Sequence, residues 1–442
     1  MDFEKKTKEM LAFIEKSPSC YHVIANVEEI LKKHGFVKLS EAAEWKLQPG
    51  GSYYTTRGGS SILAFRIPTA EFLNYQIVAS HSDSPSFKIK EQPEMMFDSH
   101  YVELNVERYG GMLCAPWFDR PLSVAGRVVV QEGTKIQTHL LDFDRDLVMI
   151  PNVAIHMNRK ANDGYSYNIQ KDMLPLLGEE GAKGSFAKMV AEQVGVAEEA
   201  VISTDLFLYN RVAGTIWGAN QEFVSSTKLD DLQCAFSSLQ GFLEGKNEKS
   251  VTVCAIFDNE EVGSTTKQGA DSTFLADVLL RINLCMGRTI EQYHTAIASS
   301  VMLSADNAHA VHPHHMDKAD PTNRPYMNHG VVIKYNANQK YTTDAISAAL
   351  FKAICEREKV PYQTYVNRSD IAGGSTLGNI SNAHVSLHTV DIGLAQLAMH
   401  SPYETAGVKD TAYMIRALAA FYKTHIRQLE DGSFELKNGL EG

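Results

Sequence analysis

Apolar residues near the N-terminus recur every three or four positions, which is the spacing of one face of a helix. We expect two helices within residues 3–36, the first carrying Leu11, Phe13 and Ile14 on its apolar face. The region from 51 to 90 has shorter apolar runs, which are typical of strands. The strands expected there are 61–65 and 75–79.

The pattern changes between about 95 and 225, where polar and apolar residues alternate along short runs such as 101–106 and 126–130. Such alternation is typical of antiparallel strands that have one face in water. After residue 226, helical and strand-like patterns alternate again. The expected elements are strands near 251–257, 300–305, 330–335, 362–367 and 385–390, a long amphipathic helix from about 404 to 428, and a mobile tail from Glu430 to Gly442.

This order of elements predicts a mixed α/β protein in which one domain is interrupted by a β-rich inserted domain. We place the first part of the α/β domain at residues 1–92, the insertion at 93–225 and the second part at 226–442. A chain of 442 residues is long enough for this, because single hydrophobic cores rarely grow beyond about 250–300 residues.

Composition then excludes some classes of function. The net charge of −11 argues against a nucleic-acid partner. No apolar stretch approaches the roughly 20 residues that a membrane helix needs, so we expect no membrane association. The chain starts with charged residues rather than a secretory signal, and its six cysteines are scattered without a CxxC pair. We therefore expect reduced cysteines and a cytoplasmic protein.

Two adjacent acids, Glu260 and Glu261, directly follow the apolar run 251–257, which predicts a buried parallel strand. In α/β proteins, chemistry gathers at the carboxyl ends of such strands. Neighbouring carboxylates repel each other and are costly to bury unless positive charge is present. Two divalent metal ions would supply that charge, and one carboxylate could then accept a proton from a metal-bound water. A solvated acidic loop is the alternative interpretation.

His81, Asp83 and Asp230 are further candidates. His81 and Asp83 follow an expected strand, and this spacing suits a metal ligand with the carboxylate that orients it. Taken alone the pair is a weak signal, because such tripeptides are common in surface turns. Asp230 begins an expected helix, where an aspartate commonly serves as a cap. Its two oxygens are equally suited to bridging two metal ions.

Later in the chain, Asp306 also follows an apolar strand, and four histidines lie within residues 309–315. His309 and His312 are nearest the strand end, where they could bind metal or substrate or lie in an exposed loop. His400 stands next to a methionine, and such a histidine is more often packed than a ligand. It remains a candidate because the site needs a final neutral ligand. We interpret the turn 373–378 as lining a substrate cleft, because it lacks the lysine of a phosphate loop.

Five short motifs occur in order along the chain: HxD at 81–83, LD at 229–230, NEE at 259–261, SAD at 304–306 and LAMHS at 397–401. This order resembles the aspartyl aminopeptidase family, which are dinuclear metallo-exopeptidases with a phosphorylase/peptidase-like α/β fold. Segments 117–127, 150–156 and 332–338 carry further similarity. The chain departs from the family pattern at Pro121 and at 371–374.

The resemblance implies a catalytic domain with two bound divalent ions, expected to be zinc, with manganese or cobalt as alternatives. The implied ligands are His81, Asp230 and Asp306 for one ion and Asp230, Glu261 and His400 for the other. Asp230 would therefore bridge the two ions. Glu260 would be the general base that activates a metal-bridging water, and Asp83 would support His81.

By the same resemblance, the enzyme would remove N-terminal residues from peptides, with a preference for Asp or Glu. Lys334 is the candidate partner of an acidic substrate side chain, although a surface lysine is the equal alternative. His309 could stabilise an oxyanion. The insertion would form dimers that assemble into a tetrahedral dodecamer, and His156 would reach a neighbouring subunit's site. A broader-specificity aminopeptidase, or a deacylase or dipeptidase of the same fold, is the alternative function.

Overall fold

The computed structural model describes residues 2–438 of the chain. The two expected N-terminal helices are present as α1 (Phe3–Glu15) and α2 (Cys20–Lys33). Asp2 caps α1 by accepting a hydrogen bond from the Lys5 N–H at 3.0 Å. The apolar faces of both helices are buried. The apolar residues spaced three or four apart in the sequence therefore mark the side of each helix that packs against the rest of the protein.

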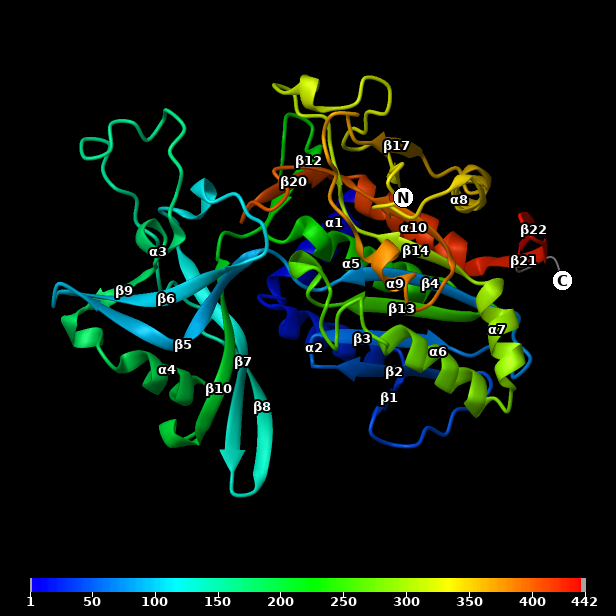
Figure 1. Cartoon of the computed structure of the whole chain (residues 1–442), viewed down its shortest axis with the longest axis horizontal. Helices are drawn as coiled ribbons and strands as arrows, with labels where there is room; N and C mark the ends of the chain where they lie inside the picture. The colour runs from blue at the N-terminus through cyan, green and yellow to red at the C-terminus, as the bar shows by residue number, and fades with distance from the viewer. Residues whose placement is uncertain (1, 439–442) are drawn as a thin grey trace.

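A nine-stranded mixed sheet forms the centre of the larger part of the molecule, with the order β1-β2-β3-β13-β4-β14-β18-β16-β17 (Figure 1). The inner strands β13, β4, β14 and β18 are parallel to one another, whereas β3 and β16 run antiparallel to their inner neighbours. The strands are β1 (Val37–Leu39), β2 (Ser52–Arg57), β3 (Ser61–Arg66), β4 (Tyr75–His81), β13 (Val251–Phe257), β14 (Val301–Ala305), β16 (Val331–Tyr335), β17 (Tyr362–Val366) and β18 (His388–Gly393).

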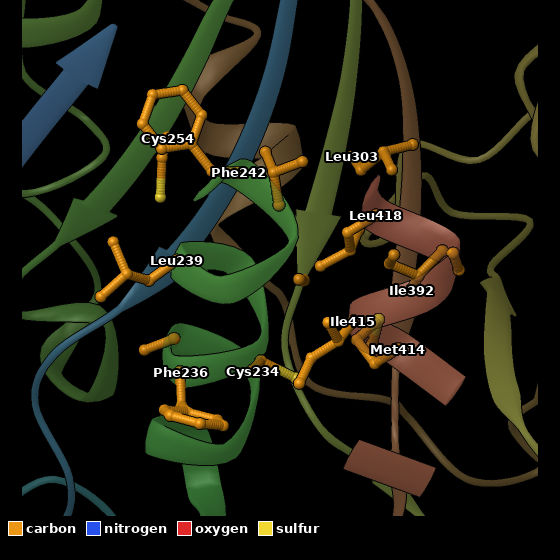
Figure 2. Close-up of a cluster of buried hydrophobic side chains, with 14 of the residues drawn as sticks. Cys234, Phe236, Leu239, Phe242, Cys254, Leu303, Ile392, Met414, Ile415 and Leu418 are labelled. Atoms are coloured by element: carbon orange, nitrogen blue, oxygen red, sulfur yellow. The ribbon is translucent and has the colours of Figure 1, made fainter. Parts of the chain in front are cut away.

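Helices cover both faces of this sheet. One core contains residues of α1, α2, α5 (Leu229–Glu244), α8 (Ala345–Arg357) and α10 (Asp410–Lys423). The other core contains residues of α6 (Phe274–Cys285), α7 (Ile290–Ala298) and α9 (Leu377–Ser381). Figure 2 shows the first core where α5 and α10 lie side by side over the strands. Gly241 permits this approach, because a Cβ there would lie 2.6 Å from the Cβ of Leu418.

A separate six-stranded antiparallel sheet stands beside the nine-stranded sheet and has its own apolar core (Figure 1). Its order is β8-β7-β10-β5-β6-β9, and α4 (Ser185–Val194) packs against β8. These elements are β5 (Ser86–Phe97), β6 (Tyr101–Tyr109), β7 (Leu122–Glu132), β8 (Lys135–Asp142), the short helix α3 (Ile169–Asp172), β9 (Leu176–Glu179) and β10 (Val201–Asn210). We propose that this sheet, whose strands span residues 86–210, corresponds to the inserted domain that the sequence places at 93–225.

A third sheet has five short strands, ordered β11-β12-β20-β19-β15. Its strands are β11 (Thr215–Trp217), β12 (Phe223–Ser226), β15 (Ala308–His309), β19 (Ala395–Leu397) and β20 (Glu404–Gly407). Two segments adjoin these strands, namely the start of α5 after β12 and the turn between β19 and β20. The sheet thus connects chain segments that are 178 residues apart through the pairing of Ser226 with Glu404.

The C-terminal expectations need correction. The helix predicted from 404 to 428 is shorter, because α10 spans only Asp410–Lys423. Residues 404–407 instead pair with β12, and Thr424–Glu430 forms β21, whose alternately buried Thr424 and Ile426 follow strand spacing. The predicted tail is also wrong as far as residue 438, because β22 (Ser433–Asn438) pairs with β21. Residues 439–442 of that predicted tail lie outside the described residues.

The strand predicted at 385–390 is found at His388–Gly393, three residues later. The other expected strands of the second half are present at or within a residue or two of their predicted positions. Across residues 2–438, no helix is both long enough and apolar enough to cross a membrane.

Candidate metal centre

The side chains predicted to bind metal lie together at one edge of the nine-stranded sheet. Strands β13, β4 and β14 are adjacent and parallel, so their carboxyl ends meet at that edge. His81 is the last residue of β4, and Asp306 directly follows β14. Glu260 and Glu261 lie in a single 3₁₀ turn just after β13. The register of three parallel strands therefore brings together residues that are far apart in the sequence.

Asp230 joins these residues from the start of α5. Its backbone is not helical, with φ −86° and ψ 107°, and Lys228 before it has a left-handed φ of 53°. The cap residue of α5 is Lys228 rather than Asp230, and within residues 2–438 Oδ1 of Asp230 accepts no hydrogen bond. Its Oδ1 lies 3.6 Å from Nε2 of His81, and its Oδ2 lies 3.4 Å from Nε2 of His400. Asp230 therefore lies between the two histidines, two residues after the cap position of α5.

Two overlapping groups of donor atoms could each hold a metal ion. Within each group, the donor atoms lie within 4.8 Å of one another. The first group is His81, Asp230, Asp231 and Asp306, and the second is Asp230, Glu261 and His400. A third combination, His81 with Glu260 and Glu261, connects them. Asp230 belongs to both main groups, which is the arrangement expected of a carboxylate that bridges two ions.

Asp231 was not among the predicted site residues. It is fully buried, and its Oδ2 accepts the backbone N–H of His81 at 3.1 Å. Its only sequence signal is its position directly after Asp230 in the pair of aspartates. Burial and the neighbouring Asp306 and Asp230 raise the pKa of Asp231 well above its usual value, because each disfavours the charged carboxylate.

The donor set fits divalent cations. Oδ1 of Asp230 and Oε1 of Glu261 are buried, and within residues 2–438 neither accepts a hydrogen bond. Buried carboxylate oxygens are normally paired, so these two are available to a cation. Carboxylate and imidazole donors together suit zinc and other first-row divalent metals. The side chains of His81 and Glu261 are 1% and 3% exposed, whereas that of His400 is 33% exposed.

The pKa shifts in the centre show the same excess of negative charge. Burial raises the pKa of Glu260 to about 8, and Asp306, Asp83 and Asp230 contribute by repulsion. Burial disfavours a charged His81, but the surrounding carboxylates outweigh it and raise the pKa of its ring well above the usual value. These raised pKa values mean that the cluster lacks positive charge to balance its carboxylates. Bound metal ions would provide that charge.

Asp83 lies between His81 and the turn that carries both glutamates. Its two carboxylate oxygens accept the backbone N–H groups of Glu260 and Glu261, each at 3.2 Å. Nδ1 of His81 lies 3.3 Å from Asp83 Oδ1 and 3.1 Å from the Asp83 carbonyl oxygen. Asp83 therefore holds the His81 ring and the 3₁₀ turn that carries both glutamates in one arrangement.

Tyr109 is a residue that sequence reasoning missed. It is the last residue of β6 in the six-stranded sheet, and its hydroxyl donates to Asp83 Oδ2 at 2.7 Å. The hydroxyl oxygen of Tyr109 in turn accepts a hydrogen bond from Asn259 Nδ2 at 2.9 Å. Nearby, Leu113 N donates to the carbonyl of His400 at 3.1 Å. No local pattern marks Tyr109, since its role depends on how the two sheets pack.

The predicted substrate-binding residues are placed differently from one another. Lys334 on β16 is buried, and its Nζ donates to the carbonyls of Asp306 at 2.7 Å and Asn307 at 3.2 Å. The same Nζ lies 3.4 Å from Asp306 Oδ2, so Lys334 adjoins the centre. The imidazole of His309 packs edge-on to Tyr365, with ring centroids 6.0 Å apart. His156 lies in an exposed loop of the six-stranded part.

Comparison with known proteins gives the family. A family model described as aminopeptidase I zinc metalloprotease (M18) matches residues 13–422. A probable M18 family aminopeptidase 2 of Clostridium acetobutylicum is 43% identical over 96% of this chain and 99% of its own length. The corresponding protein of Stutzerimonas stutzeri is 39% identical over 94% of this chain and 97% of its own length.

Solved structures agree with this match. The structure of Ape4 in a complex with Nbr1 aligns with a TM-score of 0.92 and 34% identity, covering 95% of this chain and 86% of that one. The S. cerevisiae mApe1 dodecamer aligns with a TM-score of 0.84 and 27% identity, covering 96% and 97%. The mixed α/β fold expected from the sequence is therefore confirmed. The chain belongs to the M18 family of zinc metalloproteases, and it is a metallo-aminopeptidase.

Proposed function

We propose that this aminopeptidase works with two divalent ions held at the candidate metal centre, zinc being the first choice. His81, Asp230 and Asp306 would hold one ion, and Asp230, Glu261 and His400 the other. When bound, such ions polarise a substrate carbonyl and acidify a water molecule. The sharing of Asp230 between two groups of donors, with its Oδ1 left unpaired, is the observation that supports the proposal most strongly.

Glu260 is the proposed general base. It stands beside the ligands without being needed to complete either main group of donors. Its backbone is tied to Asp83, so its carboxylate is directed from a fixed turn. From there it can accept a proton from water and later deliver one to the departing amine. Asp83 is the residue proposed to hold this base and His81 in register.

Metal binding should be linked to protons, and this can be measured. In the metal-free protein, the carboxyl of Glu260 has a pKa of about 8, above its value in an unfolded chain. The folded state then holds a proton that the unfolded state has lost between about pH 4.5 and 8. Metal-free protein is therefore expected to lose thermal stability as the pH rises across this range, and added Zn²⁺ should restore it most at pH 8.

Differential scanning fluorimetry of chelated protein between pH 5 and 8, with and without Zn²⁺, tests this expectation. The Glu260→Gln variant is the control, because it lacks the titrating carboxyl and should lose less stability over the same range. Equal pH dependence with and without metal would contradict the assignment of these carboxylates to a metal centre.

Lys334 is proposed to favour substrates with an acidic first residue. Its ammonium group lies 3.4 Å from Asp306 Oδ2, so its positive charge would stand beside an ion held by Asp306. A Lys334→Met variant should lose at least about tenfold more kcat/KM on Asp- and Glu-amides than on Leu-amides, since a charge-assisted pair contributes about 1.5–3 kcal/mol.

A panel of Asp-, Glu-, Leu- and Lys-amides and N-acetylated amino acids, run with metal analysis, tests the proposed function as a whole. An equal loss on all amides in Lys334→Met would show that this lysine only supports Asp306. Wild-type protein that cleaves Leu- and Asp-amides equally would favour the broader-specificity alternative. Hydrolysis of the acetylated compounds alone would favour a deacylase and contradict the proposed substrate class.

We also propose that the chain assembles into a homo-oligomer, with dodecamers built from dimers as the specific expectation. The loop that follows Ile150 exposes three apolar side chains, Val153 at 57%, Ile155 at 49% and Met157 at 84%. Exposed apolar residues gathered in one loop are typical of a contact surface. The solved mApe1 relative is a dodecamer. Light scattering on the purified protein tests the proposal, and a monomer at micromolar concentration would contradict it.

A further inference from the structure

A buried carboxylate outside both groups of donors connects two of the proposed ligands. Glu404, the first residue of β20, is 1% exposed. Its Oε2 accepts the backbone N–H of Asp230 at 2.9 Å, and its Oε1 accepts the backbone N–H of His400 at 2.7 Å. Within residues 2–438 it forms no salt bridge with a lysine or arginine. Each of its two oxygens therefore accepts a backbone N–H of a proposed ligand.

The backbone on each side of these contacts adopts a conformation that needs support. Lys228, two residues before Asp230, has a φ of 53°, and His400 itself has a φ of 66°. Left-handed backbone is uncommon in residues other than glycine and persists where the surroundings hold it. Because Glu404 is bonded to both segments, it fixes the position of one turn relative to the other.

The same network continues towards the remaining ligand. Gln396 Nε2 lies 3.4 Å from Glu404 Oε1, and Gln396 Oε1 accepts Asn307 Nδ2 at 2.8 Å. Asn307 directly follows Asp306 and also donates to the carbonyl of Leu229 at 3.0 Å. A continuous set of buried hydrogen bonds therefore joins the segments that carry Asp230, His400 and Asp306.

We propose that Glu404 is a positioning residue of the metal centre. It sets the separation between Asp230 and His400, and so the affinity for the ion that these two residues would share with Glu261. This inference rests on the proposed ligand set. A carboxylate is required because both of its oxygens are acceptors. Glutamine has nearly the same shape, but its NH₂ group would face one of the two backbone N–H donors and leave it unpaired.

The Glu404→Gln variant tests this role. Metal-free protein titrated with Zn²⁺ or Co²⁺ is expected to bind one of its two ions about 10–100-fold more weakly than wild type, as is typical when the support of a metal ligand is removed. Turnover should return to near the wild-type level at raised free metal, because Glu260 is untouched. A purely structural role would lower the thermal midpoint without this change in one ion's affinity.

Asp410→Asn provides a matched control. Asp410 is also fully buried and accepts two backbone N–H groups, from Asn328 at 2.6 Å and Gly330 at 3.0 Å, but these lie in a turn that carries no proposed ligand. This variant should lose stability while keeping wild-type affinity for both ions. If Glu404→Gln does not fold, Glu404→Asp serves instead, since its shorter side chain cannot reach both N–H groups.

The outcomes separate the inference from the function on which it rests. Wild-type affinity for both ions in Glu404→Gln would overturn the positioning role, provided that His400→Ala loses one ion. If His400→Ala retains both ions, or wild type binds only one, the ligand assignment itself fails, and the positioning role of Glu404 is overturned with it. Equal weakening in Asp410→Asn would show that loss of stability alone lowers metal affinity, which also overturns the inference.

Discussion

Glu260→Gln is expected to lower kcat by roughly 10³-fold or more while both metal ions stay bound, since general acid–base catalysis contributes about 10²–10⁴-fold. The amide keeps the size of the side chain and the backbone N–H that donates to Asp83. It cannot accept a proton at neutral pH, so attack by water loses its base. Steady-state rates on an aminoacyl amide, together with metal content by mass spectrometry, measure both parts.

Glu261→Gln is the matched control for this change. It makes the same carboxylate-to-amide change at the adjacent residue. Unlike Glu260, however, Glu261 belongs to the group of donors with Asp230 and His400, and its Oε2 lies 3.3 Å from Nε2 of His400. This variant should lose one ion. Loss of metal in Glu260→Gln instead would show that Glu260 is a ligand, and wild-type turnover would show that it is not the base.

Asp230→Ala is expected to abolish measurable turnover and to leave fewer than one ion per chain. Asp230 is the residue common to both main groups of donors, so its removal takes a ligand from each ion. Bound metal stabilises a folded protein by about 2.7 kcal/mol when its concentration is 100 times the dissociation constant. The variant should therefore show no rise in thermal midpoint when Zn²⁺ is added, whereas wild type should show a clear one.

Asp410→Ala is the control for Asp230→Ala, because it removes a buried aspartate from the start of α10 and leaves the centre intact. It should be less stable and still respond to Zn²⁺. Retention of one tightly bound ion in Asp230→Ala would contradict a bridging role and place Asp230 on a single ion.

The parts of the centre that could be predicted lie next to strong local patterns. Apolar runs located β13 and β14, and the acids that follow them had to meet at one sheet edge once the strands were parallel. Asp231 and Tyr109 could not be found in this way, since their contacts depend on the start of α5 and on a second sheet. The order of motifs, rather than any one spacing, suggested the family.

The error at the C-terminus has a physical cause. Apolar residues between 404 and 428 fit a helix, but strand partners decide the two ends of that stretch. Residues 404–407 pair with β12, and Thr424–Glu430 pairs with β22. Pairing between distant segments overrides local spacing, and it is also what brings Glu404 to Asp230.

The contact of Tyr109 with Asp83 has a consequence for how this chain can be divided. The Tyr109 hydroxyl that donates to Asp83 comes from the six-stranded sheet. A side chain on the neighbouring Gly110 would place its Cβ only 3.1 Å from the Cβ of Glu261. A catalytic half expressed without that sheet would lack a hydrogen-bond donor at its centre. For protein engineering, we therefore expect that exchanging or trimming the six-stranded sheet will also disturb the metal centre unless Tyr109 and Gly110 are kept.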